Sequence, residues 1–294
     1  MVDVLGPAPK PQKVWQKQFD YNDDALVKLA NADWNKIPSD CLGEYFYDMA
    51  YVDLLQPDLF RHVFPACLKY WYETLMKNKS TECSGSEFHF ALINKNIVEK
   101  FLTEKQKESL WTFFCDGFMD RIDDQKGFSL DRRPKDASPS NLHNWIWRFN
   151  SLGIVAPVIK PIWDDWWKLD SHGKAICAIL YLSGLIYVGG DNPIYGKWTP
   201  ERGGGGPYLS EDDSYIFNLS WREDNLNYLK STLSVNYVFE KLDKAVQILS
   251  DHPDSQMAVR VAGDAKTCSD IIEIRIEDVL EDLSKVQLAK DVRV

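Results

Sequence analysis

The chain has 294 residues, of which 45% are hydrophobic and 27% charged, a balance typical of a folded globular protein rather than a disordered one. Its net charge of −10 repels nucleic acid phosphates and so disfavours a function in DNA or RNA binding. The N-terminus carries no hydrophobic signal segment, and the longest apolar run, residues 175–188, is too short for a membrane span. We therefore expect a cytoplasmic protein without a membrane segment.

The cysteine and aromatic residues limit the kinds of protein to which this chain could belong. The six cysteines lie far apart, without a CxxC pair or zinc-ribbon spacing, which indicates reduced, buried side chains rather than a metal site or a disulfide framework. Aromatic residues make up 13% of the chain and include 11 tryptophans. Such a surplus is compatible with a bulky core and also with a recognition surface, because both environments are rich in aromatic side chains.

Proline and polar segments divide the first half of the chain. Residues 1–14 are Pro-rich and predict a flexible tail, followed by an N-terminal helical lobe over 15–125. Within this lobe we predict helices over 23–32 and 42–55. The second of these should end before Pro57, because a proline disfavours helical geometry in the residue before it.

The stretch 48–122 is aromatic-rich and contains the clearest helix signals. Pro65 suits the first turn of a new helix, where its missing N–H has no cost. An apolar face at three-to-four spacing follows it: Cys67, Tyr70, Trp71, Thr74 and Leu75. Thr103 and Gln106 form a capping box that starts another helix. That helix carries one apolar face of Leu110, Phe113, Phe114, Gly117 and Phe118.

The polar segment 123–141 predicts a boundary, after which a C-terminal, mainly helical lobe should cover 140–294, or form one compact domain with the first lobe. A helix is expected over 142–149. Pro157 and Pro161 then indicate an irregular stretch or a break between short helices.

The next helix should begin at a cap formed by Ser171 or Asp170 and run to about Val188. Its apolar residues cover more than one face, which predicts burial at the centre of the lobe. Gly189 and Gly190 follow as a C-terminal stop. Residues 78–87 and 191–213 are predicted loops, and the second is rich in glycine and proline.

Short strands are expected in the C-terminal half. Tyr215, Phe217, Leu219 and Trp221 alternate with polar residues. Residues 257–261 and 272–276 alternate in the same way and predict a small β-ribbon. An apolar face of Val238, Leu242, Ala245 and Leu249 predicts a helix, and a last helix is expected over 277–290. The predicted fold class is mainly α, a multi-helix, bundle-like globular fold with a few short β-strands in the C-terminal half.

No complete catalytic motif is present. The run Gly203–Gly206 lacks the Lys and Ser or Thr of a phosphate-binding loop, so it reads as a loop or a binding element. The five histidines include no HExxH pair, and no serine lies in a G-x-S-x-G turn. Acidic clusters at 123–124, 164–165 and 211–213 are compatible with Mg²⁺ binding or with solvated surfaces and helix starts.

Two motifs within 48–122 carry a resemblance. Residues 60–68 read FRHVFPACL and residues 101–106 read FLTEKQ. In these pieces the chain resembles a group of uncharacterised bacterial helical proteins, some of which are similar to immunity proteins, acidic cytoplasmic inhibitors encoded beside a toxin. The resemblance covers about a quarter of the chain and implies no catalytic residue or cofactor. The Trp-rich second half departs from it.

Charge, aromatic content, the missing motifs and this resemblance together predict a non-catalytic binding protein, an immunity- or antitoxin-like inhibitor. Its partner would be a basic toxin or effector, not a nucleic acid or a membrane, and no cofactor is expected. The predicted partner-binding residues lie on the glycine-rich loop: Trp198, Tyr208, Glu211, Asp212 and Asp213.

Two alternatives stay open. The first is a metal-dependent hydrolase or transferase with a helical active site built from His172, Asp170, Asp164 and Asp165. The second is a scaffold subunit of a homo-oligomer.

Overall fold

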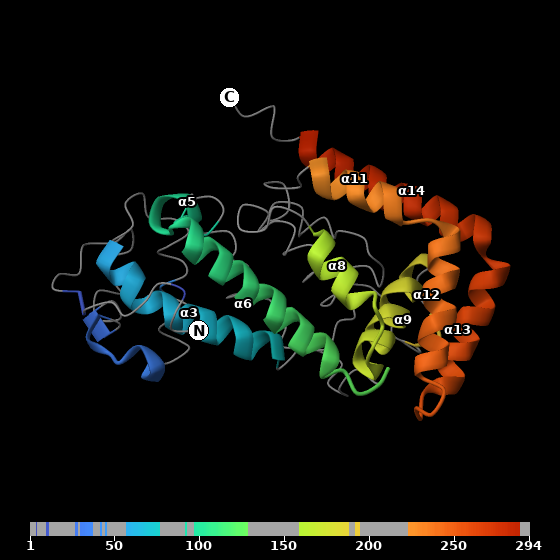
Figure 1. Cartoon of the computed structure of the whole chain (residues 1–294), viewed down its shortest axis with the longest axis horizontal. Helices are drawn as coiled ribbons and strands as arrows, with labels where there is room; N and C mark the ends of the chain where they lie inside the picture. The colour runs from blue at the N-terminus through green and yellow to red at the C-terminus, as the bar shows by residue number, and fades with distance from the viewer. Residues whose placement is uncertain are drawn as a thin grey trace. The chain divides into compact units, whose positions relative to one another are not determined.

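The computed structural model is mainly helical, as the sequence predicts (Figure 1). It describes residues 4, 10–11, 27–28, 30–37, 42, 45, 57–76, 92, 97–128, 159–187, 192–194 and 223–288. None of these residues lies in a β-strand. Residues 142–149, 198–221 and 78–87, for which we predict a helix, a loop with a strand, and a loop, lie outside the described residues.

The first part of the chain contributes four described elements: the short 3₁₀ helix η2 (Trp34–Lys36), α3 (Pro57–Met76), α5 (Ile97–Phe101) and α6 (Glu104–Asp123). The second part contributes α8 (Lys160–Trp166), α9 (His172–Ile186), α11 (Glu223–Thr232), α12 (Val235–Ile248), α13 (Ser255–Thr267) and α14 (Ser269–Leu288). Leu42 and Tyr45 are helical, as are Val27, Lys28, Ala30 and Asn31, within the two helices predicted before α3.

The backbone divides into two compact units. The first comprises residues 1–117 with 154–156, and the second comprises 118–153 with 157–294. Helix α6 therefore supplies its residues up to Gly117 to the first unit and its last turns to the second.

Aromatic side chains build the core of the first unit. Trp71 of α3 lies with its ring centroid 4.7 Å from that of Phe114 and 5.6 Å from that of Phe113, both on α6. Phe60 and Phe64 are fully buried on the same helix as Trp71. The predicted apolar faces of the two helices are confirmed at Trp71 and Phe114, which are both buried, and Phe60 and Phe64 extend the core beyond the predicted face of α3.

The structure differs from the prediction at one of the two prolines of α3. Pro57 begins the helix, and residues 46–56, where the preceding predicted helix should end, lie outside the described residues. Pro65 lies in the helix interior instead of the first turn. An interior proline removes one backbone hydrogen bond and commonly costs about 3 kcal/mol. The helix continues through Pro65 because its buried face, including Phe60, Phe64 and Trp71, extends on both sides of it.

The capping box at the start of α6 is confirmed. The backbone N–H of Thr103 donates to Oε1 of Gln106 at 2.8 Å, and the N–H of Gln106 reaches Oγ1 of Thr103 at 3.4 Å. Both groups belong to the first turn, where backbone N–H groups have no partner within the helix.

Helix α9 is the centre of the second unit. All its residues from Gly173 to Ile186 are buried, as its broad apolarity predicts. Helices α12, α13 and α14, coloured orange to red in Figure 1, pack against it. Trp163, Trp166 and Trp167 around the end of α8 surround Tyr181 of α9, with ring centroids 5.6–5.9 Å from it.

The predicted β-ribbon is wrong. Residues 257–261 lie in α13 and residues 272–276 lie in α14. Alternation over five residues also places Ile272 and Ile276 four positions apart, on one side of a helix, and both are buried. The helix predicted from the stripe in α12 is confirmed, with Val238, Leu242 and Ala245 buried.

Candidate functional site

The five residues predicted to bind a partner, Trp198, Tyr208, Glu211, Asp212 and Asp213, lie outside the described residues. Their role stays a prediction. The described part of the chain contains the four residues of the predicted enzymatic alternative and a second acidic surface, on α14.

A turn between two helices positions the first group. Helix α8 ends at Trp166, and α9 begins after the cap residue Ser171, whose Oγ accepts from the N–H of Lys174 at 3.2 Å. Between them Leu169 adopts a positive φ of 51° while its side chain is fully buried. A non-glycine residue in this region costs about 1–2 kcal/mol, which the burial of the leucine side chain offsets.

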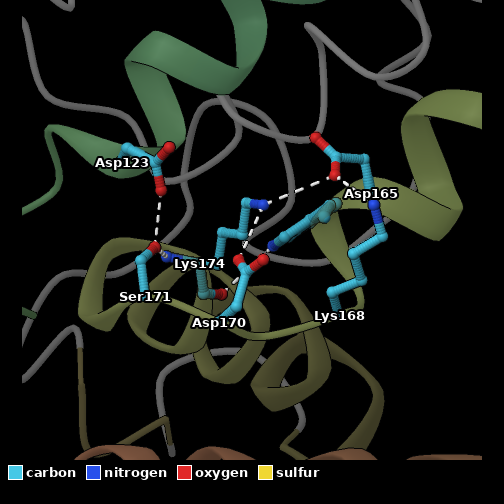
Figure 2. Close-up of polar contacts among 7 residues, drawn as sticks. Asp123, Asp165, Lys168, Asp170, Ser171 and Lys174 are labelled. Carbon is cyan, nitrogen blue, oxygen red and sulfur yellow. Dashed lines mark hydrogen bonds and ion pairs between the residues drawn. The ribbon is translucent and has the colours of Figure 1, made fainter.

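We define the α8–α9 corner as residues 165–174 together with Asp123 at the end of α6. Its centre is Lys174, whose side chain is only 7% exposed and whose Nζ lies 2.8 Å from Oδ1 of Asp170 (Figure 2). The same Nζ lies 3.6 Å from Oδ1 of Asp165, which also pairs with Lys168 at 2.8 Å. Two lysines and two aspartates thus neutralise one another.

Helix polarity explains this pairing. Lys174 lies in the first turn of α9, where the positive end of the helix dipole disfavours a cation. Burial makes its charge more costly still, so it needs carboxylate partners. A hydrogen bond from Lys174 lowers the pKa of Asp170, and the positive charge of Lys174 adds to this effect. Trp166 closes the corner by donating from Nε1 to the carbonyl oxygen of Lys174 at 3.1 Å.

The corner also fastens α9 to the end of α6. Oγ of Ser171 donates to Oδ1 of Asp123 at 2.5 Å, on the left in Figure 2. Gly173 lies so close to α6 that a Cβ atom on it would stand 2.4 Å from the carbonyl oxygen of Ile122. Sγ of Cys177 lies 3.8 Å from that same oxygen, and burial raises the pKa of this thiol to about 12.

Asp164, adjacent to Asp165 in sequence, has different partners. Tyr228 of α11 donates its hydroxyl to Oδ1 of Asp164 at 2.6 Å, and Lys160 pairs with Oδ2. Burial raises the pKa of Asp164, but the hydrogen bonds from Lys160 and Tyr228 outweigh it and lower the pKa overall. Burial in turn raises the pKa of Tyr228, and its bond to Asp164 raises it further.

His172 is separate from Asp170 and is paired with Asp251 of the α12–α13 loop, with Nε2 and Oδ1 3.3 Å apart. Its ring stands edge-on to that of His252, with centroids 5.4 Å apart. Nδ1 of His252 accepts from the N–H of Asp254 at 3.1 Å, which assigns the ring proton to Nε2, the donor to the carbonyl of Lys126 at 3.1 Å.

The four residues of the enzymatic alternative are therefore not gathered into one site. Lys174 joins Asp165 to Asp170, whereas Asp164 pairs with Lys160 and Tyr228, and His172 with Asp251. Within the described ranges, no group of three His, Cys, Asp or Glu side chains is placed to hold a metal ion. The described helices likewise include none with the length and hydrophobicity of a membrane-spanning segment.

The outer face of α14 has the opposite character. We define it by six exposed residues: Asp270, Ile271, Glu273, Ile274, Glu277 and Asp278. Ile271 is 39% exposed and Ile274 is 57% exposed. Glu273, Glu277 and Asp278 have no hydrogen-bond or ion-pair partner among the residues that the structure describes.

The sequence contains a signal for this face, and the strand interpretation obscured it. Ile272, Ile276 and Val279 are buried at helical spacing, so they define the inward side of α14. Ile271 and Ile274 fall outside that spacing, and the acidic residues Asp270 and Glu273 precede them directly in sequence. Reading the segment as a helix would have left two isoleucines facing solvent.

Comparison of the chain with family models, curated proteins and solved structures gives no match.

Proposed function

We propose that this chain is a non-catalytic protein that binds a basic protein partner. In its most specific form, drawn from the resemblance to immunity proteins, the partner is a basic toxin or effector that the chain inhibits by covering its cleft. The proposal rests on a contrast in how the carboxylates are used.

The observation that carries it is the outer face of α14. Three carboxylates there face solvent without a cation among the described residues, beside two exposed isoleucines. A chain with a net charge of −10 already attracts cationic proteins at long range. A surface where unpaired negative charge and apolar side chains coincide adds short-range affinity to that attraction.

The carboxylates of the predicted enzymatic alternative also support this proposal, because each of them is already paired with a cation. Asp164, Asp165 and Asp170 each hold a lysine, and Asp164 also accepts from a tyrosine. A metal or a substrate would have to displace these cations. A structural role for the three aspartates accounts for their contacts without further assumptions.

The test begins with capture of the partner. The full chain, immobilised and exposed to a lysate of its source cells, should retain a basic protein that then forms a defined-ratio complex when both are purified. The association rate of that pair should fall steeply with ionic strength, since electrostatic steering is screened over about 10 Å at 0.1 M salt.

The loop prediction is tested on the same complex. Glu211→Lys/Asp212→Lys/Asp213→Lys should slow association at low salt by about tenfold or more. The matched control reverses three exposed acids of α6, Glu108→Lys/Asp116→Lys/Asp120→Lys, and changes the net charge equally. A partner that is itself acidic, or an association rate insensitive to salt and to every reversal, would reject the proposed function.

A further inference from the structure

We propose that the outer face of α14 is a docking site for a basic amphipathic helix of a partner protein. This inference rests on the proposed function and names the surface and the kind of segment that it accepts. It concerns residues of α14 and not the predicted contact residues 198–213.

The apolar part of the face has the spacing of a helix-recognition surface. Ile271 and Ile274 are three positions apart in α14 and therefore lie one turn apart along the same side. Ile272 and Ile276, which alternate with Ile274 in sequence, are buried, whereas Ile271 and Ile274 keep 39% and 57% of their surface exposed. A helix docked along α14 would meet them with apolar residues at three-to-four spacing.

The charged part of the face selects the sign of the partner. Asp270 and Asp278 flank the isoleucines along the helix, and Glu273 and Glu277 are exposed one and three positions from Ile274. Lysines or arginines beside the partner's apolar residues would reach these carboxylates. The only nearby cation within the described side chains of α14, Arg275, is half-buried rather than exposed.

Charge also argues against the other occupants. A second copy of this chain would bring the same carboxylates face to face, and like charges opposed at an interface disfavour association. Nucleic acid and anionic membranes are repelled for the same reason. A basic segment of a different protein is the occupant that satisfies both the isoleucines and the acids.

The test uses the full chain and a designed probe. A fluorescein-labelled peptide of leucine and lysine, with leucines at helical three-to-four spacing, is compared by fluorescence anisotropy with a scrambled peptide of identical composition. The wild-type chain should bind the amphipathic peptide about tenfold more tightly, because only that peptide presents an apolar stripe and a charge at once.

Matched variants locate the contact. Ile274→Ser should weaken binding of the amphipathic peptide by about tenfold, whereas Val27→Ser, at a similarly exposed position of the first unit, should leave it within about twofold. Glu277→Gln/Asp278→Asn should weaken binding and flatten its salt dependence. The control pair Glu108→Gln/Asp116→Asn on α6 removes the same number of charges and should do neither.

Three results would overturn the inference. The first is equal binding of the scrambled peptide, which would mean attraction by net charge alone. The second is equal weakening by test and control variants. The third is a self-associated wild-type chain in sedimentation that becomes monomeric in Ile274→Ser, which would assign the face to a second copy.

Failure of this inference is distinguishable from failure of the proposed function. If the captured partner binds in a salt-dependent way and responds to the loop reversal but not to Ile274→Ser, the function stands and the α14 site falls. If no basic partner is captured and the designed peptide does not bind, both fall.

Discussion

The α8–α9 corner and the outer face of α14 are both rich in carboxylates, but their surroundings are opposite. In the corner, Asp165 and Asp170 hold the buried Lys174, and Asp123 accepts from Ser171. On α14, Glu273, Glu277 and Asp278 have no partner among the described residues. Acidic residues therefore stabilise the fold in one region and are free to meet a cation in the other, so five experiments follow from this contrast.

The largest difference should appear in the reactivity of two cysteines, Cys177 of α9 near the corner and Cys268 just before α14. Burial raises the pKa of Cys177 to about 12, so at pH 8 its thiolate population is roughly a thousandfold below that of an unfolded chain. Cys268, just before α14, is partly exposed. Alkylation followed by peptide mass spectrometry should label Cys177 only after unfolding in urea. Comparable labelling of the two thiols in the folded protein would contradict the packing of α9 on α6.

Two glycines provide the next contrast. Gly173→Ala places a Cβ 2.4 Å from the carbonyl oxygen of Ile122 and 2.7 Å from the Cα of Asp123, backbone atoms that cannot rotate away. We expect a loss of about 3 kcal/mol in the free energy of unfolding, at the upper end of the overpacking range. Gly263→Ala in α13 has nothing within 4 Å of the added atom and should stabilise by about 0.5–1 kcal/mol through helix propensity. Urea denaturation measures both, and an unaffected Gly173→Ala would show that α6 and α9 are further apart.

Lys174 tests how much the buried charge contributes. Lys174→Ala removes both the ion pairs and the packed side-chain stem, and should cost about 1–2 kcal/mol. Lys174→Met keeps a stem of similar length and should cost less than half of that, because the desolvation of the ammonium is relieved together with the loss of its partners. Equal losses in the two variants would assign the contribution to charge instead of packing.

The ion pair between Asp170 and Lys174 should make the stability of the fold sensitive to acid. The pKa of Asp170 is below its ordinary value of 3.8, chiefly because Lys174 donates a hydrogen bond to it. A depressed carboxyl pKa stabilises the fold above the unfolded pKa, and that stability is lost as pH falls through the folded value. Carboxyl NMR titration should find the pKa of Asp170 raised toward 3.8 in Lys174→Met, and urea midpoints below about pH 4 should fall less steeply than in wild type. No rise in the Asp170 pKa would mean that the pair does not persist in solution.

The smallest effect on stability should come from α14. Glu277→Gln/Asp278→Asn removes two solvated carboxylates without a described partner, so the free energy of unfolding should change by less than about 0.5 kcal/mol. Thermal unfolding measures it. A larger loss would show that these acids stabilise the fold, which would weaken the proposal that they bind a partner protein.

Much of the local structure could be predicted because its causes lie within a few residues. The side chains of Thr103 and Gln106 each accept a hydrogen bond from the other residue's backbone N–H, and Ser171 caps α9. Both helix starts therefore follow from side chains that reach only three positions along the chain. The stripe through Val238, Leu242 and Ala245 likewise has one spacing, and it is the spacing of a helix.

Predictions that depended on distant packing were less successful. Pro65 lies inside α3 because aromatic residues on both sides of it are buried, a gain that no local rule for proline contains. Residues 272–276 alternate as a strand would, yet α9, α11, α12 and α13 pack beside α14, and a helix there buries Ile272 and Ile276 together.

For the candidate sites, the order of residues specified which acids exist but not which of them are neutralised. Asp164 and Asp165 are neighbours in sequence and equal in chemistry. One accepts from Tyr228, 64 positions away, and the other shares Lys174 with Asp170. Local order dictates caps, stripes and net charge because those interactions span a turn or act over the whole chain. Tertiary packing alone decides whether a given carboxylate is paired or exposed, because the cation that would pair with it comes from a distant segment.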